Sequence, residues 1–182
     1  MVLKQKCILL IIAFCCAIGC TKPVDFSQAS NLELEPVIES SLIFYRANAG
    51  DFFSGNTEER SVSDFVQAEI FRNNFVKENL IRADFVFEIE NSINRAFELT
   101  ISYKDVGGQV LDTFALNAEA SPTNEILEFN FTEIFEGNRL DILKQTEIFE
   151  FTLTMQSGAP ITGTSPGEIG LKSKVAFYFS IQ

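Results

Sequence analysis

Few side chains in this sequence could take part in catalysis or metal binding. The residue types that are absent exclude several kinds of active site. The sequence has no His and no Trp among its 182 residues. Without an imidazole, Ser-His-Asp and Cys-His catalysis and His-ligated zinc sites are excluded. A pair of carboxylates is then the remaining route to hydrolytic chemistry.

The best-placed carboxylate pair is Glu88 with Glu90. These residues alternate with apolar ones, so they share one face of an expected strand, about 6–7 Å apart along the backbone. Glycosidases use two carboxylates at comparable separations, one of them with a raised pKa. The same alternation is typical of the solvated outer face of an antiparallel sheet, which neither raises a pKa nor excludes water. We therefore expect no catalytic residues.

A turn-rich segment holds the other two candidate sites. Asp51, Glu58 and Glu59 could bind Ca²⁺ together with backbone carbonyls, but the ligand spacing of a calcium loop is missing, so we expect no metal and no cofactor. Phe52 and Phe53 lie between two polar turns, where adjacent rings cannot easily both point inward. This pair is a possible contact loop, with one ring exposed to a partner.

Alternating apolar and polar residues predict strands through most of the chain after residue 32. Pro36 makes the first of them an edge strand or a kinked strand, and Gly107-Gly108 predicts a hairpin between two alternating runs. The clearest alternation lies in two segments. In 82–90 it places Phe85, Phe87 and Ile89 on one face of a strand, and in 97–103 it places Phe97, Leu99, Ile101 and Tyr103 on one face of the next. Other expected strands cover 38–45, 66–70, 110–116, 126–131, 146–155 and 171–181.

One short helix is expected at 138–145, with Asn138 as its N-cap and Leu140 and Leu143 facing inward. Seven or eight strands at even spacing with one helix predict an all-β fold. The fold class is a two-sheet antiparallel β-sandwich, Ig-like or a related Greek key, with one short helix near 138–145.

Composition supports a folded domain and excludes one class of partner. Hydrophobic residues make up 46% of the chain and include 19 Phe, which is enough for a core. The four Cys are residues 7, 15, 16 and 20, so the domain after residue 20 contains no disulfide. The formal net charge is −11, and loss of Lys4 and Lys6 with a leader would leave −13. An acidic surface repels phosphate backbones, so no nucleic-acid partner is expected.

The N-terminus has the layout of a bacterial export signal. Lys4 and Lys6 precede an apolar stretch over residues 7–19, which is shorter than the roughly 20 residues of a spanning helix. An ordinary cleaved secretory signal would also fit this layout. The run Cys16-Ala17-Ile18-Gly19-Cys20, however, resembles the lipobox of bacterial lipoproteins. The resemblance implies cleavage before Cys20 and lipidation of its thiol.

These observations divide the chain into a lipoprotein signal peptide at 1–19, the lipidated Cys20 and a tether at 20–31, and a β-sandwich domain at 32–182. The tether residues 21–31 reach at most about 40 Å. Residues 36–42, 87–97 and 141–146 resemble a group of lipoproteins from flavobacteria and other Bacteroidota that carries no assigned activity. The resemblance implies the cell envelope, and in this phylum the outer membrane, with the leaflet open.

We therefore expect a non-catalytic envelope protein held in the membrane by lipid on Cys20. It would act as a scaffold or protein-binding module whose partner is an envelope protein. The alternative is a carbohydrate-binding or sugar-processing accessory lipoprotein, whose partner would be a glycan. An exposed apolar patch would favour the first, and polar groups converging in a pocket would favour an enzyme.

Overall fold

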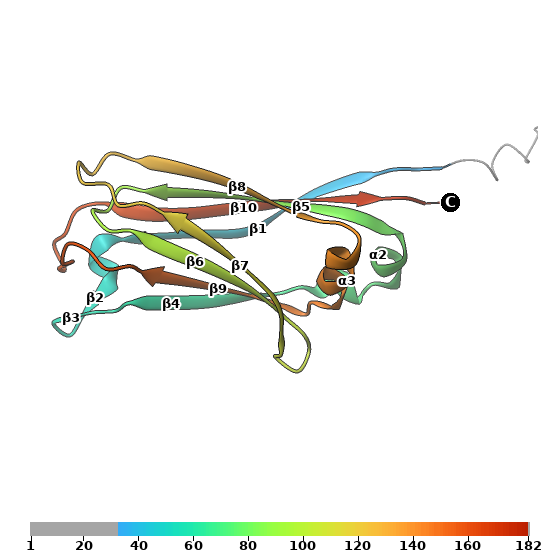
Figure 1. Ribbon diagram of the computed structural model, residues 1–182, viewed down its shortest axis with the longest axis horizontal. Helices are drawn as coiled ribbons and strands as arrows, with labels where there is room; N and C mark the ends of the chain where they lie inside the picture. The colour runs from blue at the N-terminus through green and yellow to red at the C-terminus, as the bar shows by residue number, and fades with distance from the viewer. Residues whose placement is uncertain (1–32, 182) are drawn as a thin grey trace, which may run out of the picture. The chain divides into compact units, whose positions relative to one another are not determined.

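The structure of the protein is a computed structural model that describes residues 33–181. The expected signal peptide, Cys20 and the whole tether therefore lie outside the described residues. The described part consists of two four-stranded antiparallel sheets packed face to face (Figure 1). This confirms the predicted all-β sandwich.

The first sheet, sheet 1, has the order β1-β10-β5-β8, and the second, sheet 2, has the order β4-β9-β6-β7. The strands of sheet 1 are β1 (Val37–Asn48), β10 (Glu168–Phe179), β5 (Leu80–Asn91) and β8 (Leu127–Phe135). Those of sheet 2 are β4 (Ser61–Gln67), β9 (Ile148–Met155), β6 (Phe97–Lys104) and β7 (Val110–Ala118). The remaining elements are a small hairpin of β2 (Phe53–Ser54) and β3 (Thr57–Glu58), the 3₁₀ turns η2 (Ala49–Phe52) and η3 (Glu69–Arg72), and the helices α2 (Asn74–Asn79) and α3 (Asn138–Gln145).

The strand order identifies the kind of sandwich. Strands β1 and β10, β4 and β9, β5 and β8, and β6 and β7 form four antiparallel pairs. Folding these pairs into two sheets gives the eight-stranded jelly roll, which contains two Greek keys. An immunoglobulin domain divides its strands as ABED and CFG, which is a different order. Of the two alternatives predicted, an Ig-like fold or a related Greek key, the structure has the related Greek key.

The core lies between the sheets and is rich in Phe. Phe85, Phe87 and Ile89 are buried as their alternation predicts. The Phe85 ring connects the two sheets, because its centroid lies 5.4 Å from that of Phe135 and 5.7 Å from that of Phe149. Tilted and edge-to-face contacts of this kind add stability beyond the apolar area that they bury.

Two local predictions need correction. The strand expected at 66–70 ends at Gln67, and the chain continues into η3 and then α2, neither of which was predicted. The Phe71 ring packs 5.8 Å from that of Phe177, so tertiary burial overrides the local alternation. Helix α3 has the expected bounds, but its N-cap is Gly137 at φ 54°, not Asn138, and no side chain caps it.

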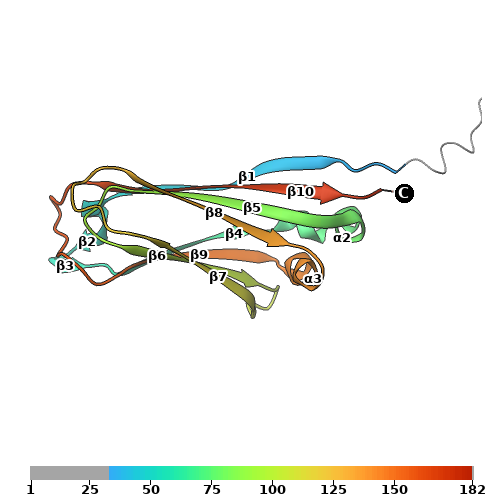
Figure 2. The ribbon, with the colours of Figure 1, turned by 45° about the horizontal axis from the view of Figure 1, so that its top comes forward.

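The sandwich has two different ends (Figures 1 and 2). The helical end holds α2, α3, the turn between β6 and β7, and the point where the described chain begins, since Leu34 pairs with Ile181. The loop end holds the β2–β3 hairpin and the loops 92–96, 119–126 and 156–167. Within residues 33–181, no helix has the length and apolar character needed to cross a bilayer.

Candidate functional site

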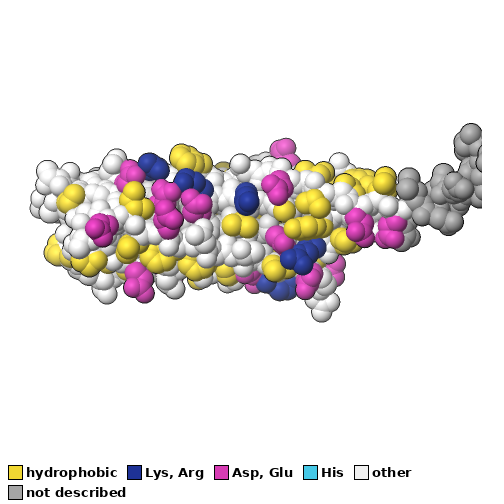
Figure 3. Space-filling view, turned by 90° about the horizontal axis from the view of Figure 1, so that it is seen from above, with side chains coloured by type: hydrophobic (Ala, Val, Ile, Leu, Met, Phe, Trp, Pro, Cys, Tyr) yellow, Lys and Arg dark blue, Asp and Glu magenta, His cyan; other side chains and the backbone are white. Residues whose placement is uncertain are grey.

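The carboxylate pair predicted from the sequence lies on the outer face of sheet 1. Lys172 Nζ lies 2.9 Å from Glu88 Oε1 and 2.5 Å from Glu90 Oε1, and Arg46 Nη2 lies 3.3 Å from Glu90 Oε2. The hydrogen bond from Lys172 lowers the pKa of Glu90 below its ordinary value, although burial opposes it. A general acid needs the opposite shift. Figure 3 shows such cationic and acidic side chains side by side on this face. The pair is thus an ion-pair network on the sheet surface.

The acidic residues considered for Ca²⁺ bind other groups. Asp51 Oδ2 accepts the backbone N–H of Asn48 at 2.7 Å. Glu58 Oε1 accepts the N–H of Ile161 at 2.8 Å, and Glu58 Oε2 lies 3.1 Å from Arg95 Nη2. Across residues 33–181, no three His, Cys, Asp or Glu side chains lie close enough together to hold a metal ion.

The structure places the two rings of the possible contact loop differently. Phe52 is only 1% exposed, and its ring centroid lies 5.1 Å from that of Phe97 in the core. The 3₁₀ turn η2 directs this side chain inward. Phe53, the first residue of β2, is half-buried. The segment therefore offers a partner only part of one ring. The predicted lipidation site, Cys20, lies outside the described residues.

A buried arginine holds the loop end together, and no sequence pattern pointed to it. Arg95 is 5% exposed. Its Nε donates to the Gln156 carbonyl at 2.5 Å, its Nη1 donates to the Ala159 carbonyl, and its Nη2 binds Glu58. The guanidinium thus joins the 92–96 bend to the 156–167 loop and to β3.

A different feature could bind a partner: an apolar groove on the side of the sandwich where β1 and β4 form the edges. Ile43 and Tyr45 of β1 and Val62 and Asp64 of β4 line its mouth. Its floor consists of buried side chains from both sheets, which are Ile89, Leu99, Phe151, Leu153, Ile169 and Leu171. The enclosed space is small, about 30 Å³. Burial, together with the nearby Asp51 carboxylate, raises the pKa of Tyr45, so its hydroxyl stays neutral.

Two exposed aromatic rings border this edge groove. Phe44 is 70% exposed and Phe65 is 61% exposed. Phe44 follows Ile43 on β1 and points away from the groove over sheet 1, whereas Phe65 follows Asp64 on β4 and points over sheet 2. The two rings therefore lie on opposite outer faces of the sandwich, one on each side of the groove. Alternation alone does not predict this, because Phe44 lies in the continuous apolar run Leu42-Ile43-Phe44-Tyr45 and Phe65 lies between Asp64 and Val66.

The edge strands are built in a way that discourages pairing with a further strand. Register shifts between Ser41 and Ile43 give β1 a bulge against β10. The other three edge strands each carry one inward-facing carboxylate: Asp64 on β4, Asp112 on β7 and Glu133 on β8. Bulges and inward charges are common guards of exposed edges. A partner would therefore contact the edge groove through side chains.

Comparison with known proteins adds a likeness in fold only. No family model and no curated protein matches the chain. A solved subviral particle of infectious bursal disease virus VP2 is 10% identical with a TM-score of 0.44, and the match covers 80% of this chain and 39% of that one. A desmodium yellow mottle tymovirus structure is 11% identical with a TM-score of 0.33, covering 82% of this chain and 90% of that one. The enzymatically active domain of bacteriophage CBA120 tailspike protein 4 is 7% identical with a TM-score of 0.37, covering 81% and 19%. This chain therefore spans about two fifths of the VP2 chain, and likenesses this distant say nothing about its function.

Proposed function

We propose that the protein is a lipid-anchored, non-catalytic component of the cell envelope that binds a partner protein through the β1/β4 side. The observation that carries this proposal is the edge groove bordered by Phe44 and Phe65. Large exposed apolar surface on a soluble domain commonly marks an interaction site. The candidate carboxylates Glu88, Glu90 and Glu58, by contrast, are held in ion pairs and a backbone hydrogen bond.

Burial of the two exposed Phe rings would contribute substantially to the free energy of binding a partner. Fully burying a Phe side chain contributes about 1.5–3 kcal/mol. At 70% and 61% exposure, Phe44 and Phe65 retain most of that area, so their joint burial would contribute about 2–4 kcal/mol. Such a gain corresponds to roughly 30-fold to 1,000-fold in the dissociation constant.

Site-specific photo-crosslinking in the native cell tests the partner. A benzophenone amino acid replaces Phe44 or Phe65 in the full chain, and Ser102, on the outer face of sheet 2, serves as the control position. We expect positions 44 and 65 to yield the same protein adduct and position 102 to yield none. Absence of a shared adduct, or equal adducts from all three positions, would refute a site on the β1/β4 side.

The N-terminal layout and the lipobox-like run support the anchor. Labelling cells with a radioactive fatty acid tests it directly. We expect label on the wild-type protein and none on Cys20→Ser, because only a thiol accepts the diacylglyceryl group. Equal label on both proteins would show that Cys20 is not the attachment site.

One observation favours the glycan alternative as a second candidate. The exposed Phe44 ring lies in register with Lys172, beside Glu88 and Arg46, so an aromatic surface adjoins hydrogen-bonding groups on the outer face of sheet 1. Affinity electrophoresis in polysaccharide gels separates the two candidates. Glycan binding would be lost in Phe44→Ala and kept in Phe65→Ala, whereas partner binding through the edge groove should weaken in both.

A further inference from the structure

The helical end carries exposed apolar side chains from three separate segments. Ile70 of η3 is 38% exposed, Phe75 of α2 is 45% exposed, and Val106 in the turn between β6 and β7 is 82% exposed. Figure 3 also shows hydrophobic side chains gathered toward this end on the sheet 1 side. Folding thus brings exposed apolar side chains from distant parts of the sequence to one end of the sandwich.

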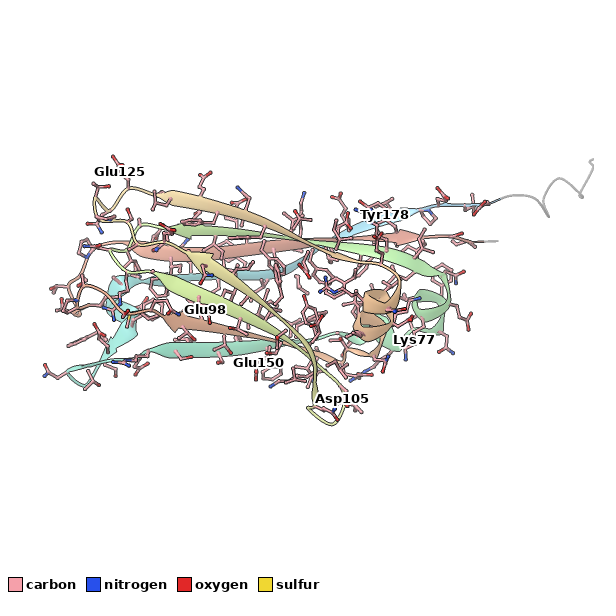
Figure 4. All side chains as sticks on the ribbon, in the orientation of Figure 1. Lys77, Glu98, Asp105, Glu125, Glu150 and Tyr178 are labelled. Atoms are coloured by element: carbon pink, nitrogen blue, oxygen red, sulfur yellow. The ribbon has the colours of Figure 1, made fainter. Side chains whose placement is uncertain are left out.

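Two lysines without an ion-pair partner accompany these side chains. Lys77 of α2 and Lys144 of α3 line one hollow together with Val106, and neither forms a salt bridge within residues 33–181. Figure 4 shows Lys77 and Asp105 at this end of the molecule. The carboxylates that line the same hollow are engaged: Asp105 Oδ1 accepts the N–H of Gln109 at 2.8 Å, and Glu147 pairs with Arg72.

The described chain also begins at this end. The Leu34 N–H donates to the Ile181 carbonyl at 3.0 Å, which fixes the start of the domain beside the end of β10. The 14 residue steps from Cys20 to Leu34 span at most about 50 Å. The loop end lies roughly another 40 Å away, because β5 and β10 are each 12 residues long and rise about 3.4 Å per residue.

From these three observations we infer that the helical end rests on the bilayer surface that holds the lipid on Cys20, with Ile70, Phe75 and Val106 dipping into the interface. This inference depends on the proposed lipid anchor. Apolar side chains bordered by lysines suit the interfacial region, since Lys stems stay in the apolar zone while their ammonium groups reach lipid phosphates. The short tether keeps the local concentration of bilayer high, so a small patch is sufficient.

In this arrangement the loop end would point away from the membrane. The edge groove would lie on the side of the sandwich, between the membrane and the loop end. The net charge, −11 for the full chain and −13 after loss of Lys4 and Lys6 with the leader, opposes electrostatic attraction to anionic lipid, so the apolar contacts must dominate. We therefore expect docking on neutral phosphatidylcholine vesicles and little change between low and high salt.

The absence of Trp from the chain makes a clean fluorescence test possible. Phe75→Trp and Val106→Trp each place a single indole at the helical end of the full lipidated protein. Ile126→Trp places one at a 59% exposed aliphatic position near the loop end as the matched control. Each protein is reconstituted into phosphatidylcholine vesicles with and without brominated lipid.

We expect a blue shift and at least twofold quenching by brominated lipid at positions 75 and 106, with neither at position 126. Quenching at all three positions, or at none, in protein that floats with the vesicles would overturn the docking and leave the anchor standing. A blue shift that appears without lipid and grows with protein concentration would assign the patch to a second copy and also overturn it. Protein that fails to float would refute the anchor itself, and the docking with it.

Discussion

Replacing Arg95 by Met should destabilise the domain by about 4 kcal/mol. The substitution keeps an aliphatic stem and removes the guanidinium that is 5% exposed. The Gln156 and Ala159 carbonyls would lose their donor, at about 1–3 kcal/mol for each buried acceptor. Glu58 would suffer less, because it keeps the Ile161 N–H and its side chain is 23% exposed. The total agrees with the roughly 3–5 kcal/mol lost when one partner of a buried pair is removed.

Urea and thermal unfolding would measure this loss. For a domain of this size, 4 kcal/mol corresponds to a fall in Tm of roughly 8–16 °C. The matched control is Arg46→Met, because Arg46 also binds two carboxylates, Glu90 and Glu168, yet is 46% exposed. Its loss should cost less than about 1 kcal/mol. The reasoning fails if the two variants unfold alike, since burial of the Arg95 cluster would then contribute nothing to stability.

Further predictions concern the core and the response to acid. Phe87→Ala should cost about 3–5 kcal/mol in denaturant unfolding, because Phe87 is fully buried, whereas Val86→Ala on the outer face of the same strand should cost far less; equal costs would mean that the strand faces are inverted. Tyr103→Phe should leave stability unchanged or raise it by up to about 1 kcal/mol, because the buried hydroxyl has no hydrogen-bond partner among residues 33–181; a loss above about 1 kcal/mol would reveal one. The hydrogen bond from the Ile161 N–H and the charge of Arg95 hold the pKa of Glu58 in the folded protein below its ordinary value of 4.5. Glu58 therefore stabilises the fold fully above pH 4.5, and this stabilisation is lost as the pH falls through the pKa of the folded state. Glu58→Gln should therefore show a shallower fall in Tm below about pH 4.5 than the wild type, and an identical acid profile would contradict this cause.

Local patterns predicted what depends on local residues. The alternation around Phe85 and Phe87 gave the correct buried face, because a strand places every second side chain on the same side. The bounds of α3 were also predicted, since Leu140 and Leu143 are both buried. The Gly107-Gly108 turn joins β6 to β7 as expected, with Gly108 at φ 80°. In each case the deciding interactions lie within a few residues.

The errors arose where distant segments decide the outcome. Alternation does not determine which strands become neighbours, so the jelly-roll order could not be distinguished from other Greek keys. Phe71 lies in η3 because the rings of Phe149 and Phe177 bury it, and both come from far along the chain. Arg95 gave no signal either, since its backbone acceptors belong to a loop about 60 residues away. The edge groove likewise exists only after β1 and β4 reach the same side.

The guarded edges have a consequence for a protein confined to a surface. If lipid holds many copies in one leaflet with their sandwiches upright, neighbouring edges meet side by side, and diffusion in two dimensions makes such encounters frequent. An open strand would then extend from copy to copy as a continuous sheet. The bulge in β1 and the carboxylates Asp64, Asp112 and Glu133 oppose that growth at all four edges. Copies can therefore crowd together laterally and still remain separate molecules, each with its edge groove free to bind a partner.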